Sequence, residues 1–264
     1  MKYCHFQTAE GALYGLVENI KAQEMITRAI DPPLRVGRGN LVIPRIQPIP
    51  LAEAQLLPPV APSKIVCIGR NYKAHAEELG HDLPPEPLIF LKPPSSIIAH
   101  SAEIRRPKLS QRVDHEGELG VIIGRTCYRL SDDEPVRPYI HGYTCVNDVT
   151  ARDLQDKDGQ WSRAKGFDTF CPVGPVVCNE LDPWAGVAVE TRVNGKVRQS
   201  GNTLAFIFSL DVIIRHIARV MTLYPGDLIS TGTPAGVGPL QAGDRVEVTV
   251  EGVGTLANPV VDEA

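Results

Sequence analysis

The 264-residue chain lacks the features that mark membrane, nucleic-acid-binding and secreted proteins. No uncharged apolar run reaches the roughly 18 residues that a membrane-spanning helix needs. Its 27 basic and 31 acidic residues give a net charge of −4, without the clustered basic excess of a nucleic-acid-binding surface. Residues 1–5 contain no apolar core of a signal peptide. These absences predict a cytoplasmic protein that has neither a nucleic-acid partner nor a membrane partner.

The six cysteines are scattered, and none belongs to a CxxC pair. Cys67 and Cys145 lie inside apolar strand-like runs, where a free cysteine acts as a small hydrophobic side chain. A reducing compartment is therefore expected. Two other motifs are incomplete. Residues 236–239 lack the third glycine of a dinucleotide-binding loop, and residues 162–165 lack the partner motifs of penicillin-recognising enzymes.

The distribution of proline divides the chain. Residues 1–30 have the pattern of short strands, and eight prolines follow between Asp31 and Pro62. Proline fixes φ and cannot donate a ladder hydrogen bond, so this stretch is expected to be an extended connection. We predict a small β-rich N-terminal domain with its proline-rich connection over residues 1–60, and a larger domain over residues 61–264.

Within the larger part, short apolar or alternating runs predict strands at residues 64–68, 88–91, 121–123, 142–148, 187–193 and 246–250. Asn194-Gly195 predicts a hairpin turn after the run at 187–193. Helices are expected at 73–79, ended by Gly80, and after Ser209, which can cap an apolar helix face. The polar stretch 150–166 is expected to be a helix plus a loop. The fold class is therefore mixed, mainly β with a few helices, without regular βαβ alternation.

Glu116 and Glu118 stand immediately before the apolar run at 121–123. If the strand already includes them, both carboxylates point to one face and repel each other unless a cation lies between them. The alternative is a pair of exposed glutamates. Asp148, expected at a strand end, completes an all-oxygen set that suits Mg²⁺ or Mn²⁺. His115 is adjacent but would point away from the two glutamates.

His75 and Glu78 are three residues apart on the short predicted helix and so share one face. A carboxylate bonded to one imidazole nitrogen fixes the tautomer and raises the basicity of the other nitrogen, which makes a plausible general base. An incidental pair on an exposed helix is the alternative. Lys165, which precedes a glycine, has the spacing of an ordinary solvated loop charge.

Taken together and in this order, several short motifs resemble the fumarylacetoacetate hydrolase family, closest to its short branch of acylpyruvases and oxaloacetate decarboxylases or tautomerases. The resemblance covers about residues 63–261. The motifs are residues 69–72 with His75 and Glu78, then residues 116–118, 147–153, 164–168 and 231–239.

The resemblance implies a β-sandwich roll, a homodimer, and a Mg²⁺ or Mn²⁺ ion bound by Glu116, Glu118 and Asp148. It also implies an acid/base dyad, His75 with Glu78, on a mobile lid around residues 72–87. Lys165 would stabilise an oxyanion, and Arg70, Gln155 and Thr233 match substrate-contacting positions. The longer fumarylacetoacetases carry a further aspartate ligand near residues 69–72, which this chain lacks. That difference argues against fumarylacetoacetate itself as the substrate.

A small anionic 2-oxo acid could chelate such an ion, which would act as a Lewis acid and hold the enolate formed when a C–C bond breaks. The first hypothesis is therefore a hydrolase of acylpyruvates, such as the fumarylpyruvate-like products of aromatic catabolism. An isomerase, tautomerase or decarboxylase of oxaloacetate or 2-hydroxymuconate-type acids is the alternative. A non-catalytic metal- or ligand-binding protein is the third hypothesis.

Overall fold

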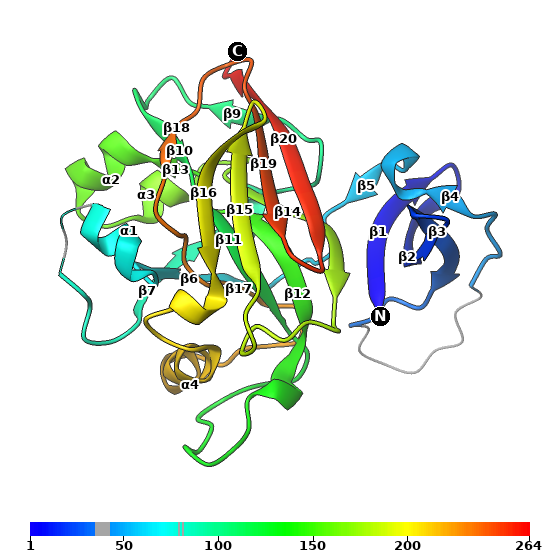
Figure 1. The fold of residues 1–264 in the computed structure, drawn as a ribbon, viewed down its shortest axis with the longest axis horizontal. Helices are drawn as coiled ribbons and strands as arrows, with labels where there is room; N and C mark the ends of the chain where they lie inside the picture. The colour runs from blue at the N-terminus through cyan, green and yellow to red at the C-terminus, as the bar shows by residue number, and fades with distance from the viewer. Residues whose placement is uncertain (35–42, 79, 81) are drawn as a thin grey trace.

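The computed structural model describes residues 1–34, 43–78, 80 and 82–264 (Figure 1). The described part is mainly β, with three sheets and four α-helices, as predicted from the sequence. Residues 35–42 of the proline-rich connection, and Leu79 and His81 of the expected lid, lie outside the described residues. Among the described residues, no helix is long and apolar enough to cross a membrane.

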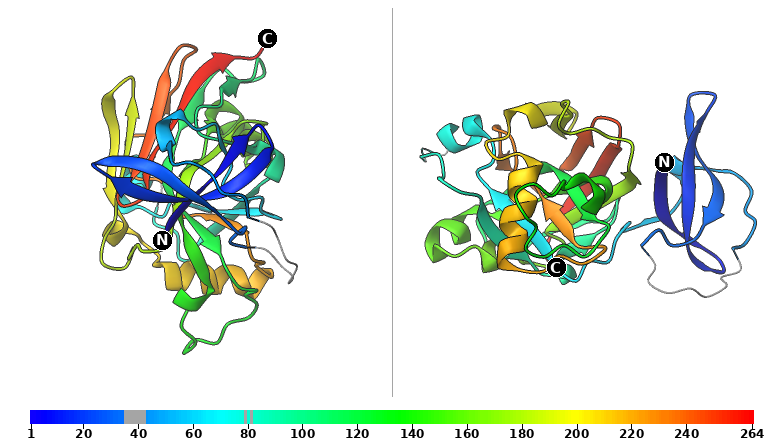
Figure 2. Two further views of the ribbon diagram at one scale, coloured as in Figure 1. Left: turned by 90° about the vertical axis from the view of Figure 1, so that its right-hand side faces the viewer. Right: turned by 90° about the horizontal axis from the view of Figure 1, so that it is seen from below.

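The N-terminal strands form a lobe at one side of the molecule, visible in Figure 1 and in the right-hand view of Figure 2. It joins the main body through the pairing of β1 with β14 (Cys171–Cys178), where Lys2 opposes Cys178 and Tyr3 opposes Val177. The boundary at residue 60 stays a prediction. The strands are β1 (Lys2–Thr8), β2 (Gly11–Ile20), β3 (Gln23–Ile30), β4 (Ile49–Pro50) and β5 (Leu56–Leu57), with the 3₁₀ turn η1 (Leu51–Glu53).

The lobe and the centre of the main body share one twelve-stranded sheet in the order β4-β3-β2-β1-β14-β12-β11-β17-β6-β7, to which β5 and β8 are attached. All seven residues of β11 are buried, as expected for a run covered on both faces. The strands of the main body are β6 (Ile65–Gly69), β7 (Leu88–Lys92), β8 (Ile97–Ile98), β11 (Gly117–Ile123), β12 (Ile140–Asn147), β14 (Cys171–Cys178) and β17 (Leu228–Ser230).

A five-stranded sheet, ordered β16-β15-β19-β20-β9, packs against β11, β12 and β14 (Figure 1). Leu119 and Val121 of one sheet and Val189 and Val248 of the other belong to one buried cluster, which forms the sandwich core. The predicted hairpin is confirmed, since the Asn194-Gly195 turn joins β15 to β16 with positive φ at both residues. The strands are β9 (Ile104–Arg106), β15 (Ala188–Val193), β16 (Lys196–Asn202), β19 (Arg245–Val250) and β20 (Gly254–Asp262).

A third sheet of three short strands, β10 (Val113–His115), β13 (Thr150–Ala151) and β18 (Gly238–Pro239), lies where the chain enters β11 and leaves β12. The polar stretch expected to contain one helix has two, α2 (Arg152–Asp158) and α3 (Ser162–Lys165). They are separated by Gly159, which caps α2 in the left-handed conformation. These elements surround the polar end of the central sheet.

Helix α4 (Leu210–Val220) begins as predicted, because the Ser209 side chain accepts a hydrogen bond from the amide of Val212. Helix α1 (Lys73–Glu78) precedes Gly80, whose φ is +67°. All six cysteines are free and buried, as expected for small hydrophobic side chains. The remaining 3₁₀ turns are η2 (Pro94–Ser96), η3 (Arg137–Tyr139) and η4 (Thr203–Ala205).

Candidate metal and active site

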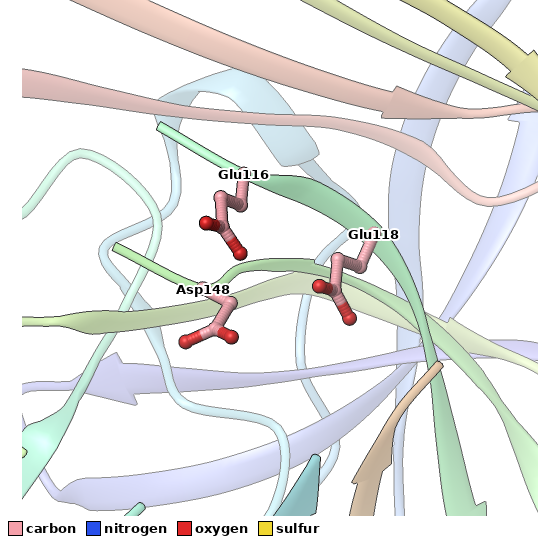
Figure 3. A group of neighbouring side chains, drawn as sticks. All are labelled: Glu116, Glu118 and Asp148. Atoms are coloured by element: carbon pink, nitrogen blue, oxygen red, sulfur yellow. The ribbon is translucent and has the colours of Figure 1, made fainter. Parts of the chain in front are cut away.

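Three carboxylates converge at the polar end of the central sheet (Figure 3). Glu116 lies between β10 and β11, Glu118 is the second residue of β11, and Asp148 directly follows β12. All three are buried, and one oxygen of each lies within 4.8 Å of the others. Buried carboxylates at this spacing could bind a divalent metal ion. The alternative of two exposed glutamates is therefore wrong.

Two of the carboxylates are neutralised by buried cations. Lys165 Nζ donates to Glu116 Oε2 at 2.8 Å and to Asp148 Oδ2 at 2.7 Å. Arg152 binds the other Glu116 oxygen at 2.5 Å, and Lys92 binds Asp148 Oδ1 at 2.7 Å. Burial alone would raise the pKa of Glu116, but the charges of Lys165 and Arg152 outweigh burial and hold this pKa well below its usual value.

Glu118 has no cationic partner among the described residues. Its Oε2 accepts hydrogen bonds from the Ser230 hydroxyl at 2.5 Å and from the amide of Gly232 at 2.7 Å. Burial, followed by the charge of Asp148, raises the pKa of Glu118 to about 8. A divalent cation between these carboxylates would remove that penalty. The buried Glu118 carboxyl group, which no cation pairs among the described residues, is thus the observation that fits a metal ion best.

The imidazole of His75 is buried, and its Nδ1 lies 3.4 Å from Glu78 Oε2. Glu78 is itself held by the amide of Gly236, which donates to both carboxylate oxygens at 3.0 Å. Burial lowers the pKa of His75 below 6.5, although the charges of Glu116 and Glu78 act in the opposite direction. At neutral pH His75 is therefore uncharged and able to accept a proton.

The predicted catalytic, metal and substrate residues, apart from Glu78, line one pocket of about 270 Å³. Arg70, which is half-buried, lines it with φ +56°, and Gln155 Oε1 accepts a hydrogen bond from Arg152. Lys165, expected from its spacing to be a solvated loop charge, is 2% exposed at the end of α3. The pocket contains Arg70, His75, Glu116, Glu118, Asp148, Gln155, Lys165 and Thr233, together with Phe90, Arg152, Asp156 and Trp161.

Sequence reasoning missed Lys92, Arg152 and the aromatic wall of the pocket. Lys92 is 1% exposed, although the sequence marks it only as the end of a strand before two prolines. Arg152 joins Glu116 to the buried Asp114, a contact that no local spacing announces. Trp161 packs edge-to-face on Phe90 with ring centroids 5.0 Å apart. Its two carboxylate partners, Asp114 and Glu116, lie 38 and 36 residues earlier in the chain, so the local sequence contains no signal that identifies Arg152.

The strand does not run continuously through the two glutamates, because β10 ends at His115 and β11 starts at Gly117. Shared alternation on one strand is therefore not what brings Glu116 and Glu118 together. The chain passes from one sheet to another at this point, and both carboxylates still reach the same cluster. His115 points away as expected, with Nδ1 3.1 Å from Gln199 Oε1.

Gly117 has no room for a side chain, because a Cβ atom there would lie 2.0 Å from the buried Thr191 hydroxyl oxygen. We expect Gly117→Ala to lower the free energy of unfolding by about 1–3 kcal/mol, the usual cost of overpacking. Urea denaturation measures this loss, and the added Thr191→Ala change should restore part of it. Gly238→Ala is the matched control, since its Cβ would meet only His115 Nε2, at 3.7 Å. Equal stability of the two alanine variants would contradict the packing argument.

Comparison with known proteins gives a family match over most of the chain. The family model described as fumarylacetoacetate (FAA) hydrolase C-terminal matches residues 64–261. The chain is 41% identical to oxaloacetate tautomerase YisK of Bacillus subtilis over 224 residues, which are 80% of this chain and 74% of the relative.

Two solved structures superpose over the full length of both chains. One is 5-carboxymethyl-2-hydroxymuconate delta-isomerase from Mycobacterium smegmatis, with a TM-score of 0.87 and 41% identity. The other is fumarylacetoacetate hydrolase from the psychrophile Exiguobacterium antarcticum, with a TM-score of 0.83 and 36% identity. The names of these similar proteins thus include a tautomerase, an isomerase and a hydrolase.

Proposed function

The chain belongs to the fumarylacetoacetate hydrolase family, and from this premise we propose that it is a divalent-metal-dependent tautomerase or isomerase of small 2-oxo acids. The observation that carries the proposal is one pocket lined both by an uncharged buried histidine and by three converging carboxylates. Proton transfer next to a carbonyl requires a base, which the histidine would be, and an electrophile, which a metal ion held by the carboxylates would be.

His75 would accept a proton from the carbon next to the 2-oxo group and return it to a neighbouring atom. Glu78, anchored by the amide of Gly236, would keep the imidazole in one tautomer and stabilise its protonated form. A Mg²⁺ or Mn²⁺ ion held by Glu116, Glu118 and Asp148 would supply Lewis acidity toward the substrate's 2-oxo and carboxylate oxygens.

Two further side chains would act on substrate charge. Lys165 stays an ammonium ion, because the charges of Asp148 and Glu116 outweigh its burial and raise its pKa. It would stabilise the negative oxygen that develops as the proton leaves carbon. Arg70, which lines the pocket, would attract the second carboxylate of a dicarboxylic substrate.

Hydrolysis of an acylpyruvate, the first hypothesis from the sequence, is the second candidate function. The uncharged His75 favours it as well, since the same base could take a proton from water. It requires one more participant than proton transfer, namely a water molecule positioned against the distal carbonyl. The isomerase and tautomerase names among the similar proteins support placing it second.

A substrate panel assayed with Mg²⁺, with Mn²⁺ and with EDTA tests the proposal. It consists of oxaloacetate, a 2-hydroxymuconate-type dienol, acetylpyruvate and fumarylpyruvate. We expect metal-dependent loss of the enol absorbance of oxaloacetate or of the dienol, without release of pyruvate or CO₂. Pyruvate release from the acylpyruvates, with oxaloacetate tautomerisation at the uncatalysed rate, would establish the hydrolase instead. No turnover of any compound would favour the non-catalytic binding protein.

A further inference from the structure

The short segment that carries two of the three carboxylates is held through hydrogen bonds to its backbone N–H and C=O groups. The amide of Glu116 donates to the Asn147 side-chain oxygen at 3.0 Å, and the carbonyl of Glu116 accepts from the amide of Asp148 at 2.8 Å. The backbone N–H and C=O groups of the next residue, Gly117, form hydrogen bonds with side chains. The positions of Glu116 and Glu118 therefore depend on what holds the peptide groups between them.

Gln199 of β16 provides one of these contacts from 82 residues away. Its Oε1 accepts from the amide of Gly117 at 3.0 Å and lies 3.1 Å from His115 Nδ1. Its Nε2 donates to the Thr233 hydroxyl and to the Pro234 carbonyl, both at 2.7 Å. Because a backbone N–H can only donate, the contact with Gly117 fixes which end of the carboxamide is the oxygen. Gln199 is 1% exposed, and all its polar atoms are used.

The Thr233 hydroxyl closes a ring. It accepts from Gln199 and donates to the Gly117 carbonyl at 2.9 Å, while the Gly117 amide donates back to Gln199. Both polar groups of one glycine are thus gripped by two side chains that also bind each other. The hydroxyl proton is committed to Gly117, so Thr233 offers the pocket a lone pair and no proton.

We propose that Gln199 is a positioning residue for the divalent cation. Through the ring with Thr233 it holds the Gly117 peptide, and thereby sets the separation of the Glu116 and Glu118 carboxylates before a metal binds. Buried partners of this kind, one step removed from the ligands, commonly change metal affinity about 10–100-fold when they are removed. The inference rests on the proposed function only in its assignment of a metal to these carboxylates.

The test measures Mn²⁺ affinity in the absence of substrate, by calorimetric titration or by the electron paramagnetic resonance signal of free Mn²⁺. Gln199→Met keeps the length of the side chain and removes its four hydrogen-bond contacts. We expect its dissociation constant for Mn²⁺ to rise about 10–100-fold. Thermal denaturation of the same samples shows whether the variant is folded.

Asn258→Leu is the matched control. Asn258 is also 1% exposed, and its carboxamide braces two backbone carbonyls, those of Ala99 and Ala102, at 2.9 and 2.8 Å. This variant should lose stability without a change in Mn²⁺ affinity. If Gln199→Met binds Mn²⁺ with wild-type affinity, or if both variants weaken Mn²⁺ binding equally, the proposed role of Gln199 is wrong and the metal assignment still stands. Failure of the wild-type protein to bind Mn²⁺ would overturn the metal assignment, and with it both proposals.

The ring can also be opened from its other side, which keeps the proposal testable if Gln199→Met does not fold. Thr233→Val removes the hydroxyl at nearly constant shape, whereas Thr233→Ser retains it. We expect Val to weaken Mn²⁺ binding about as much as Gln199→Met, and Ser to restore it. Because either change breaks the same ring, the double variant should bind Mn²⁺ about as well as either single one. Additive losses in the double variant would contradict a shared ring.

Discussion

Glu118→Gln is expected to abolish metal-dependent turnover while leaving a well-folded protein. Loss of one carboxylate ligand removes the Lewis acid, which contributes several kcal/mol to transition-state stabilisation. A loss of that size lowers the rate about 10²–10³-fold or more. The fold should survive because Glu118 is the carboxylate that has no cationic partner among the described residues. A glutamine oxygen can still accept from Ser230 and Gly232.

Asp148→Asn provides the contrast. Asp148 neutralises Lys92 and Lys165, and both ammonium groups are buried. Removing the charge would leave these cations incompletely paired, and breaking a buried ion pair costs about 3–5 kcal/mol. We therefore expect Asp148→Asn to lose both activity and stability, whereas Glu118→Gln loses activity alone. Turnover of Glu118→Gln at the wild-type rate in excess EDTA would contradict the metal assignment.

The pH dependence of stability checks the state of Glu118 independently. In the metal-free protein its pKa is raised from 4.5 to about 8, so the folded state binds this proton more tightly than the unfolded state does. The resulting stabilisation is complete below the unfolded pKa and is lost as the pH rises through the folded value of about 8. Glu118→Gln removes this pH-dependent stabilisation. In EDTA, the Tm of the variant relative to that of the wild type should therefore increase as the pH is raised from 4.5 to about 8.

His75→Ala is expected to lower kcat about 10²–10⁴-fold, the usual contribution of a positioned general base. The binding of Mn²⁺ should change little, because the three side chains that would hold the ion are carboxylates and His75 is not among them. His216→Ala is the control, since His216 lies on α4 and does not line the pocket. Kinetics of His75→Ala that match wild type would rule out the dyad as the acid/base group.

The pH profile of the wild-type enzyme identifies the same group. Burial lowers the pKa of His75 from 6.5, so the imidazole stays uncharged through neutrality and becomes protonated only at lower pH. The rate should therefore fall on the acid side with an apparent pKa below 6.5. Glu78→Gln removes a charge that opposes this shift, so the acid limb should move to still lower pH. If the acid limb of the rate profile is unchanged in Glu78→Gln, the Glu78 carboxylate does not influence the pKa of the catalytic base.

Much of the local structure could be predicted because it depends on neighbours in sequence. The strand ending at Asn147 places Asp148 at its tip, and the helix cap at Ser209 and the turn at Asn194-Gly195 need only nearby residues. Residue type made Glu116, Glu118 and Asp148 candidate oxygen ligands of a hard divalent ion, and the family resemblance of the ordered motifs favoured that role over exposed surface charges. The break at Glu116 was not predictable, because it reflects the passage of the chain between two sheets.

By itself, the sequence determined a mainly β fold, the family and the residue types of the site. Only the tertiary structure decided how the buried charge is shared. Lys92 neutralises Asp148 across 56 residues, Gln199 holds Gly117 across 82, and Glu118 is left to two neutral donors. The reason is physical. A carboxylate's pKa and position depend on every charge and dipole within a few ångströms, and folding brings those groups together from distant parts of the chain.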